Sequence, residues 1–140
     1  MKVREVMSVP AIRISAEESV EVAARWLNHY NIGALPVCAS DGRMCGLVTD
    51  RDLVTRCLAS GMRPGQTPVR DVMSGSVIAV RPDTSTEEAA RLMAQRQVRR
   101  LPVVENGKLC GMVSLGDLAT REEGAAQALS GICANVSDRK

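Results

Sequence analysis

The chain has 140 residues and a formal net charge of +2, and 1% of its residues are aromatic. That length suits one compact domain or two half-domains packed together, and no apolar stretch is long enough to cross a bilayer. The nearly balanced charge argues against nucleic-acid or membrane-surface binding. The scarcity of aromatic side chains argues against a stacking platform for single-stranded nucleic acid.

The first predicted elements are a strand and a helix. Residues 11–14 alternate in hydropathy and predict a strand, and residues 15–19 supply the chemistry of a helix start. The run Asn31-Ile32-Gly33 ends the helix, and Gly33 is able to take a positive φ. Trp26 is expected to pack rather than to hold a ligand, and His29, near the helix end, is expected to be exposed or to cap the helix. One buried stripe is formed at helical spacing by Val20, Ala23, Ala24 and Leu27.

A hairpin and a second helix follow. Residues 34–38 and 45–49 predict two short strands, joined by a turn around Asp41 and Gly42. Asp50 then caps a helix that runs to about residue 60. Residues 61–68 contain two glycines and two prolines and predict a linker.

The chain then repeats itself. Residues 3–8 (VREVMS) return as residues 69–74 (VRDVMS), and residues 46–53 return in degenerate form as residues 111–118. Such a repeat indicates two copies of one supersecondary unit, each too small to bury its own apolar face. The predicted fold is α/β, with two pseudo-symmetric β-α-β-β-α motifs at residues 1–60 and 69–128, the linker between them, and a polar tail at 129–140.

The second copy also contains residues that are typical of helix starts and hairpin turns. Ser85 and Glu88 are spaced as a capping box, which strengthens the prediction of a helix there. Asn106-Gly107 predicts a tight hairpin turn. The last helix is expected to begin near Asp117.

Both copies contain a Gly-x-Val-Thr/Ser-x-x-Asp motif where a predicted strand passes into a helix. The hydroxyl of Thr49 or Ser114 precedes a helix N-terminus, whose unpaired N–H groups attract anions such as phosphate. The carboxylate of Asp52 or Asp117 offers two acceptor oxygens, which match the two hydroxyl donors of a ribose. The simpler interpretation, ordinary helix capping, predicts the same residue types. Because the pattern occurs twice, both interpretations stay open.

These motifs give the chain a family resemblance. The sequence resembles a tandem pair of CBS motifs, the Bateman module, through Val-Met-Ser near each copy's start, the Leu-Pro-Val runs at 35–37 and 101–103, and the two junctions. The likeness covers nearly the whole chain, and among stand-alone members the sequence is similar to bacterial proteins of the hypoxic-response type. The resemblance implies a non-catalytic regulatory module that binds an adenosine-containing ligand in the cleft between the motifs.

The resemblance also implies site residues. Acidic residues hold the ribose, hydroxyl residues lie near the phosphate, and aliphatic side chains of the opposing motif enclose the adenine. One implied site combines Asp117, Ser114, Met112, Ala11, Ile12 and Ala34. The other combines Asp52, Thr49, Leu47, Val77, Ile78 and Arg99.

The two implied sites differ in charge. Arg100 stands where the family often places a phosphate-binding base, and its first-copy counterpart is Ala34. The Asp117 site is therefore expected to bind a phosphorylated adenosine more tightly, while the Asp52 site depends on Arg51 or on another residue that the sequence does not identify. Arg99 replaces Gly33 of the first copy and is large enough to fill the pocket assigned to Asp52.

The implied ligands are AMP, ADP or ATP, with NAD-type dinucleotides and S-adenosylmethionine as alternatives. A homodimer and an unidentified regulated protein are the expected partners, and no nucleic acid or membrane is expected. An enzyme acting on nucleotides is the weaker alternative, since His29 lies outside both motifs and no P-loop is present.

Five cysteines leave a second alternative open. None forms a C-x-x-C pair, so buried small side chains in a reduced cytoplasmic protein are the expected state, with no metal site. A ligand-free scaffold that responds to redox state or metal through Cys38, Cys45 and Cys110 is the competing hypothesis.

Overall fold

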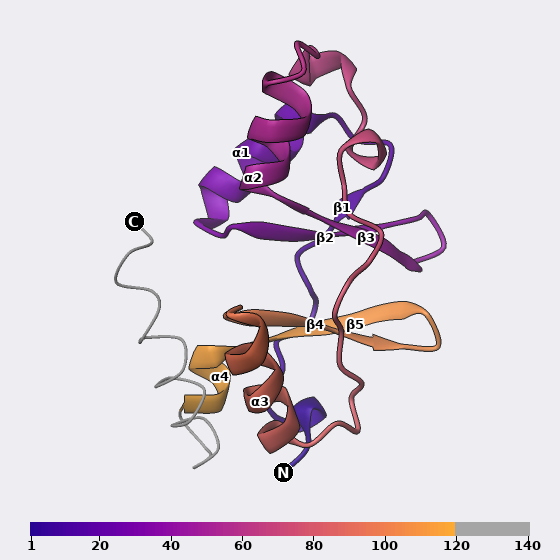
Figure 1. Cartoon of the computed structure of the whole chain (residues 1–140). Coiled ribbons are helices and arrows are strands. Elements are labelled where there is room, and N and C mark those ends of the chain that lie inside the picture. Colours follow the sequence, from indigo (N-terminus) through magenta and orange to yellow (C-terminus); the bar gives the residue numbers. More distant parts are fainter. Residues whose placement is uncertain (120–140) are drawn as a thin grey trace. The chain divides into compact units, whose positions relative to one another are not determined.

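The computed structural model describes residues 1–119, and the chain divides into two compact units (Figure 1). Ile12–Val77 form one unit, here called the N-repeat unit. Met1–Ala11 and the chain from Ile78 onward form the other, the C-repeat unit. The first residues of each sequence repeat therefore belong to the unit built by the other repeat.

The N-repeat unit has a three-stranded sheet of order β1-β2-β3. The strands are β1 (Ile14–Ser15), β2 (Ala34–Cys38) and β3 (Met44–Thr49); β1 is parallel and β3 antiparallel to β2. The predicted hairpin is confirmed, with Gly42 at φ +89° in its turn. The strand expected over residues 11–14 is wrong in extent, because only Ile14 and Ser15 pair with β2.

Helix α1 (Val20–Tyr30) confirms the predicted first helix. Ser19 is its N-cap, and its hydroxyl accepts a 3.2 Å hydrogen bond from the backbone N–H of Val22. Val20, Ala23 and Leu27 are buried as expected, and Trp26 packs against the same core. Ala24 is exposed, which corrects the predicted stripe: adjacent helical residues point about 100° apart, and Ala23 takes the core-facing direction.

The end of α1 differs from the expectation for Gly33. Asn31 takes the left-handed conformation, with φ 54°, and Gln97 does the same after the equivalent helix of the second copy, with φ 56°. Asparagine tolerates this conformation better than most residues. The helix therefore ends at the predicted run 31–33, but the positive φ belongs to Asn31 and not to Gly33.

The second helical segment consists of α2 (Asp50–Asp52) and the π-helical turns of η2 (Leu53–Leu58). Its N-cap is Thr49, so the prediction that Asp50 caps this helix is wrong by one residue. The predicted linker contains the short helix η3 (Pro64–Gln66) and packs along α1. The backbone N–H of Val20 donates a 2.8 Å hydrogen bond to the carbonyl of Thr67.

The C-repeat unit contains α3 (Thr86–Arg96), the antiparallel pair β4 (Arg100–Glu105) and β5 (Lys108–Ser114), and α4 (Leu115–Ala119). The Asn106-Gly107 turn is confirmed, with positive φ at both residues, and the last helix begins two residues before Asp117. In each unit both helices cover one face of the sheet, as predicted (Figure 1). The predicted tail, the end of the second motif and Cys133 lie outside the described residues.

Only half of the predicted capping box at α3 forms. The Ser85 hydroxyl accepts a 3.0 Å hydrogen bond from the N–H of Glu88. The Glu88 carboxylate accepts instead from Arg91, at 2.6 Å. An ion pair one turn along the helix thus replaces the reciprocal contact.

The first strand expected in the second copy is reduced to a single bridge between Val80 and Val103. In the first copy the pairing extends further, and the N–H of Ala16 donates to the Cys38 carbonyl at 3.2 Å. The equivalent of Ala16 is Pro82, which has no N–H to donate. One proline therefore accounts for the shorter pairing.

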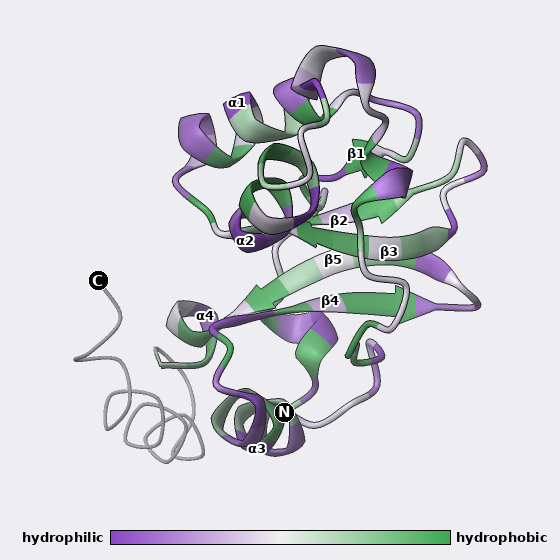
Figure 2. Cartoon of the chain, turned by 45° about the horizontal axis from the view of Figure 1, so that its top comes forward, coloured by the Kyte–Doolittle hydropathy of each residue, from purple (hydrophilic) through white to green (hydrophobic). Residues whose placement is uncertain are grey.

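Two short segments bring the start of each repeat into the other unit. Residues 3–8 and 69–74 are here called the opening segments. Val3 donates to the Thr84 carbonyl and Val69 to the Glu18 carbonyl, both at 2.8 Å. Hydrophobic residues concentrate on the strands, while α1 and α3 turn hydrophilic residues outward (Figure 2). The opening segments contribute buried Val3 to one core, and buried Val69 and Val72 to the other.

Candidate functional site

The Thr49–Asp52 junction of the N-repeat unit is a complete capping box. Thr49 Oγ1 accepts from the N–H of Asp52 at 3.1 Å, and Asp52 Oδ2 accepts from the N–H of Thr49 at 3.0 Å. The capping interpretation is therefore correct for the hydroxyl and for one carboxylate oxygen. These bonds also fix the orientation of the carboxylate, so that its second oxygen has a defined place.

The C-repeat unit repeats this geometry. Ser114 Oγ accepts from the N–H of Asp117 at 3.1 Å, and Asp117 Oδ2 accepts from the N–H of Ser114 at 2.8 Å. Both acidic side chains are partly buried. The two junctions thus present the same arrangement of hydroxyl and carboxylate on the two units.

The residue before the first hairpin strand lies at the same junction in both units. The Gly33 carbonyl accepts from the N–H of Asp50 at 3.1 Å, and the Arg99 carbonyl accepts from the N–H of Leu115 at 2.7 Å. The backbone of Arg99 therefore adjoins the Ser114–Asp117 junction of its own unit, and its side chain is exposed.

The glycine of each motif makes room for an opening segment. A Cβ added at Gly46 would lie 2.7 Å from both Met73 Sδ and the Ser74 carbonyl oxygen. A Cβ added at Gly111 would lie 2.7 Å from the Ser8 carbonyl oxygen. The missing side chain is thus needed for close packing of the backbone.

The residues after these glycines pair with the opening segments. Leu47 and Ser74 exchange two backbone hydrogen bonds of 2.9 Å. Met112 and Ser8 exchange two of 2.7 and 3.1 Å. The predicted site residues Leu47 and Met112 therefore lie beside an opening segment.

The predicted site residues divide between the two units. Register pairs each hydroxyl residue with a neighbour on the next strand: Ala34 lies opposite Thr49, and the exposed Arg100 lies opposite Ser114. The N-repeat unit contains Ile12, Ala34, Leu47, Thr49, Arg51, Asp52 and Val77. The C-repeat unit contains Ala11, Ile78, Arg99, Arg100, Met112, Ser114 and Asp117. Each implied set draws on both units.

Arg56 is a residue that sequence reasoning missed. Its Nε lies 3.8 Å from Asp52 Oδ1, and its Nη1 donates to the carbonyls of Val72 and Met73 at 3.4 and 3.2 Å. The available signal was its position four residues after Asp52, where an acid followed by a base forms a favourable helical pair.

The cysteines behave chiefly as small core residues. Cys38 and Cys57 are buried, as expected, and burial raises the pKa of the Cys38 thiol. Cys45 and Cys110 belong to different units and are partly buried. Among residues 1–119, no group of three or more histidine, cysteine or acidic side chains is placed to hold a metal ion.

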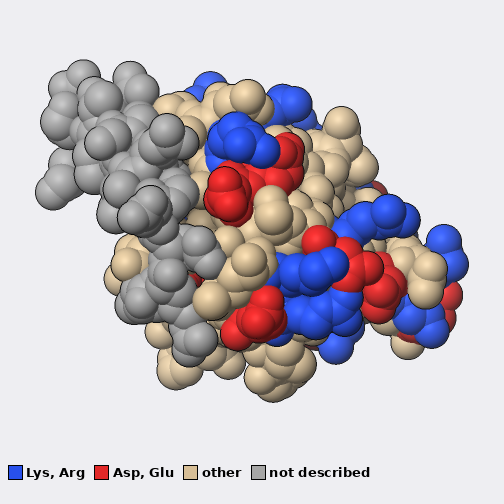
Figure 3. All heavy atoms as spheres, turned by 90° about the horizontal axis from the view of Figure 1, so that it is seen from below, with Lys and Arg blue, Asp and Glu red and all other residues tan. Residues whose placement is uncertain are grey.

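The surface outside the junctions contains an exposed histidine and several ion pairs. His29 is exposed, and its ring meets that of Tyr30 edge-on at 4.7 Å. Acidic and basic side chains alternate on the face shown in Figure 3. Arg4 pairs with Asp83, and Arg91 pairs with Glu88. Within residues 1–119, no helix combines the length and apolar character that a membrane span requires.

Comparison with known proteins finds one domain family that matches the chain at two places. The CBS domain family matches residues 3–59 and 69–124. The CBS domain-containing protein YhcV of Bacillus subtilis is 41% identical over 133 residues, which are 93% of this chain and 94% of YhcV. Hypoxic response protein 1 of Mycobacterium tuberculosis is 32% identical over 136 residues, 96% of this chain and 95% of that protein.

Solved structures are similar over most of the chain. Hypoxic Response Protein I with two coordinated zinc ions has a TM-score of 0.78 at 31% identity, over 87% of this chain and 99% of that one. CBSX2 in complex with AMP has a TM-score of 0.74 at 30% identity, over 92% and 98%. The CBS domain pair of MJ0100, in complex with 5′-methylthioadenosine and S-adenosyl-L-methionine, has a TM-score of 0.70 at 25% identity, over 86% and 94%.

Proposed function

We propose that this chain, which belongs to the CBS domain family and is a regulatory CBS pair, senses an adenosine-containing ligand. The observation that carries the proposal is the pair of junctions at Thr49–Asp52 and Ser114–Asp117. In each, the cap holds one carboxylate oxygen and so fixes the orientation of the carboxylate. An oriented carboxylate oxygen is a suitable acceptor for a ribose hydroxyl.

AMP, ADP and ATP are the proposed ligand class, with S-adenosylmethionine and NAD-type dinucleotides as alternatives. The solved relatives include one complex with AMP and one with two adenosyl compounds that carry no phosphate. Both groups of ligands share the adenosine that the carboxylates would recognise. The charge around each junction then determines which kind of adenosine is preferred.

The two junctions differ in this charge. Arg100 lies opposite Ser114, whereas the uncharged Ala34 lies opposite Thr49. An arginine binds phosphate through two parallel hydrogen bonds, which a methyl group cannot replace. We expect the Asp117 junction to prefer phosphorylated adenosines, and the Asp52 junction to discriminate less.

Ligand binding would act by shifting the association of the chain with itself, as a homodimer, or with a regulated protein. A ligand shifts such an equilibrium only through its differential affinity for the two states. No catalytic step is proposed, and incubation with ATP or AMP should yield no hydrolysis product.

A thermal-shift screen of adenosyl compounds tests the proposal directly. A ligand at about 100 times its Kd should add about 2.7 kcal/mol to the free energy of unfolding and raise Tm. Guanosine compounds are the matched controls, since they contain the same ribose and phosphates. Failure of every adenosyl compound to raise Tm, with calorimetry showing no heat of binding, would contradict the proposed function.

A further inference from the structure

Arg56 connects the Asp52 carboxylate to the opening segment 69–74. Its guanidinium lies 3.8 Å from Asp52 Oδ1 on one side and donates to the Val72 and Met73 carbonyls on the other. A guanidinium has five N–H donors in a planar fork, so it can serve both partners at once. The Asp52 side chain is only 15% exposed, so this cation is a substantial part of its surroundings.

The opening segment is held from its other side by strand β3. Ser74 and Leu47 exchange two hydrogen bonds, and Met73 occupies the space left by Gly46. Three residues after Ser74 comes Val77, a predicted adenine neighbour. The position of this segment therefore bears on both the ribose end and the adenine end of the proposed site.

We propose that Arg56 is a positioning residue that transmits the state of the Asp52 carboxylate to the opening segment. This inference rests on the proposed function, because it treats Asp52 Oδ1 as the acceptor of a ligand hydroxyl. A hydroxyl bound there competes with Arg56 for the carboxylate. The guanidinium then strengthens its hold on the Val72 and Met73 carbonyls, and the segment becomes more rigid.

An ordinary surface ion pair would behave differently. Arg25 and Glu21 form an i,i+4 pair on α1, at 2.9 Å, and both side chains are more than half exposed. Exposed pairs of this kind contribute little. Arg25 has no contact with an opening segment among the hydrogen bonds of the described residues, so it is a matched control for Arg56.

The reporter is the backbone N–H of Ser74, which donates to the Leu47 carbonyl at 2.9 Å. Its hydrogen-exchange rate follows local opening of the segment. We expect Arg56→Ala to speed exchange at Ser74 about fivefold, because the segment loses two charge-assisted hydrogen bonds. Arg56→Lys should recover part of this protection, and Arg25→Ala should leave the rate unchanged. If Arg56→Ala proves unstable, Arg56→Gln preserves much of the side-chain stem, and the same comparison with Arg25→Ala applies.

A double-mutant comparison tests the coupling without any ligand. Asp52→Asn keeps a capping oxygen and removes the charge that attracts Arg56. It should slow Ser74 exchange about twofold in the wild-type background, because Arg56 then holds the Val72 and Met73 carbonyls more firmly, and leave the rate unchanged when Arg56 is alanine. Additive effects of the two substitutions, or equal rates in Arg56→Ala and Arg25→Ala, would overturn the proposal.

The ligand arm separates the coupling from the proposed function. AMP should slow Ser74 exchange in the wild type and leave it unchanged in Arg56→Ala. If AMP binds but slows exchange equally in both proteins, the coupling is wrong and the proposed function stands. If no adenosyl compound binds the wild type, the proposed function fails, and coupling between Asp52 and the segment is decided by the double-mutant comparison.

Discussion

The N-repeat and C-repeat units build the same strand-to-helix junction on different supports. In the N-repeat unit the sheet has three strands and the hydroxyl residue faces Ala34. In the C-repeat unit the sheet has two strands and the hydroxyl residue faces Arg100. The capping distances nevertheless agree within 0.2 Å, from 3.0 to 2.8 Å at the carboxylate, with both hydroxyl contacts at 3.1 Å.

This comparison shows that the junction depends on local chemistry, whereas its surroundings are free to differ. A box of hydroxyl and carboxylate closes over four residues, so local residues are enough to form it, as they do at both junctions. The residue across the strand is not part of that box. Ligand preference can therefore differ between the units without disturbing the shared geometry.

The largest effect is expected at the two motif glycines, where the units should behave alike. Gly46→Ala and Gly111→Ala should each lower the free energy of unfolding by about 2 to 3 kcal/mol, because the new methyl group meets a carbonyl oxygen at 2.7 Å. Urea denaturation of the full chain measures the loss. Gly75→Ala is the control, since its Cβ would meet its nearest atom at 4.0 Å. A loss at only one of the two glycines would break the equivalence of the units.

A smaller effect is expected when the N-repeat sheet is given the proline of the C-repeat sheet. Ala16→Pro removes the N–H that donates to the carbonyl of the buried residue Cys38. It should lower the free energy of unfolding, measured by urea denaturation, by about 2 kcal/mol. The control is Ala16→Gly, which keeps the N–H donor. Ala39→Pro would not serve, because the N–H of Ala39 also donates a hydrogen bond. Equal stability of Ala16→Pro and Ala16→Gly would show that Pro82 does not explain the shorter pairing.

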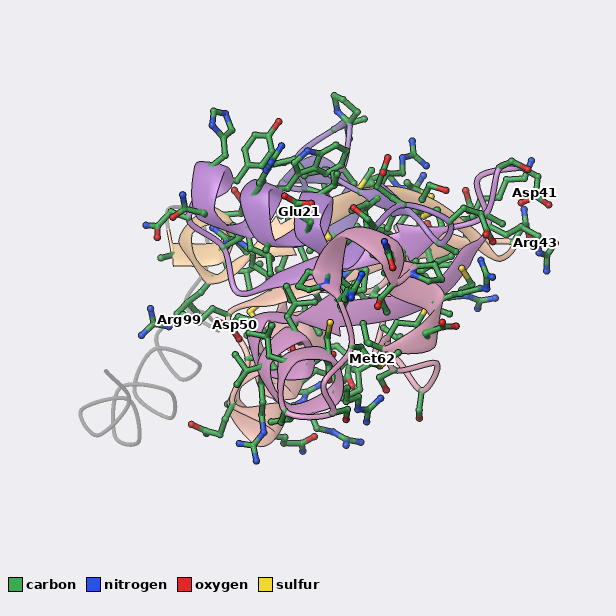
Figure 4. All side chains as sticks on the ribbon, turned by 90° about the horizontal axis from the view of Figure 1, so that it is seen from above. Glu21, Asp41, Arg43, Asp50, Met62 and Arg99 are labelled. Atoms are coloured by element: carbon green, nitrogen blue, oxygen red, sulfur yellow. The ribbon has the colours of Figure 1, made fainter. Side chains whose placement is uncertain are left out.

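The charge difference between the units should appear in nucleotide affinity. Asp117→Asn should weaken AMP binding about tenfold, and Asp52→Asn less, because Arg100 accompanies only the Asp117 junction. Asparagine keeps one capping oxygen, so the helix start is preserved. Calorimetric titration measures the affinities, and Asp41→Asn at the hairpin tip is the control (Figure 4). Equal losses from the two junction variants would remove the proposed asymmetry.

The smallest effect is expected at the capping hydroxyls. Thr49→Ala and Ser114→Ala should each lower the free energy of unfolding by about 1 kcal/mol, which is the usual loss when an N-cap hydroxyl is removed. Thr49→Ser keeps the acceptor and should restore most of the stability. If Ser114→Ala is neutral while Thr49→Ala is not, the two boxes contribute unequally despite their equal geometry.

Local elements were predictable from the sequence wherever the deciding contact lies within a few residues. The Ser85 cap, the Asn106-Gly107 turn and the hairpin strand Ala34–Cys38 all follow from residue types that set their own backbone geometry. The prediction for Gly33 failed for a related reason. Asparagine and glycine both tolerate a left-handed residue, and Asn31 comes first along the chain.

The sequence by itself determined the repeat, the α/β class and the residue types at the two strand-to-helix junctions, because hydropathy periodicity and helix-start residues are local properties of the chain. Tertiary structure alone decided that the opening segments pair with the other repeat's unit, that Gly46 and Gly111 admit those segments, and that Arg56 reaches Met73. These contacts join residues far apart along the chain. They form only when burial of the two apolar cores brings the segments together, and no local sequence pattern predicts which segments will pair.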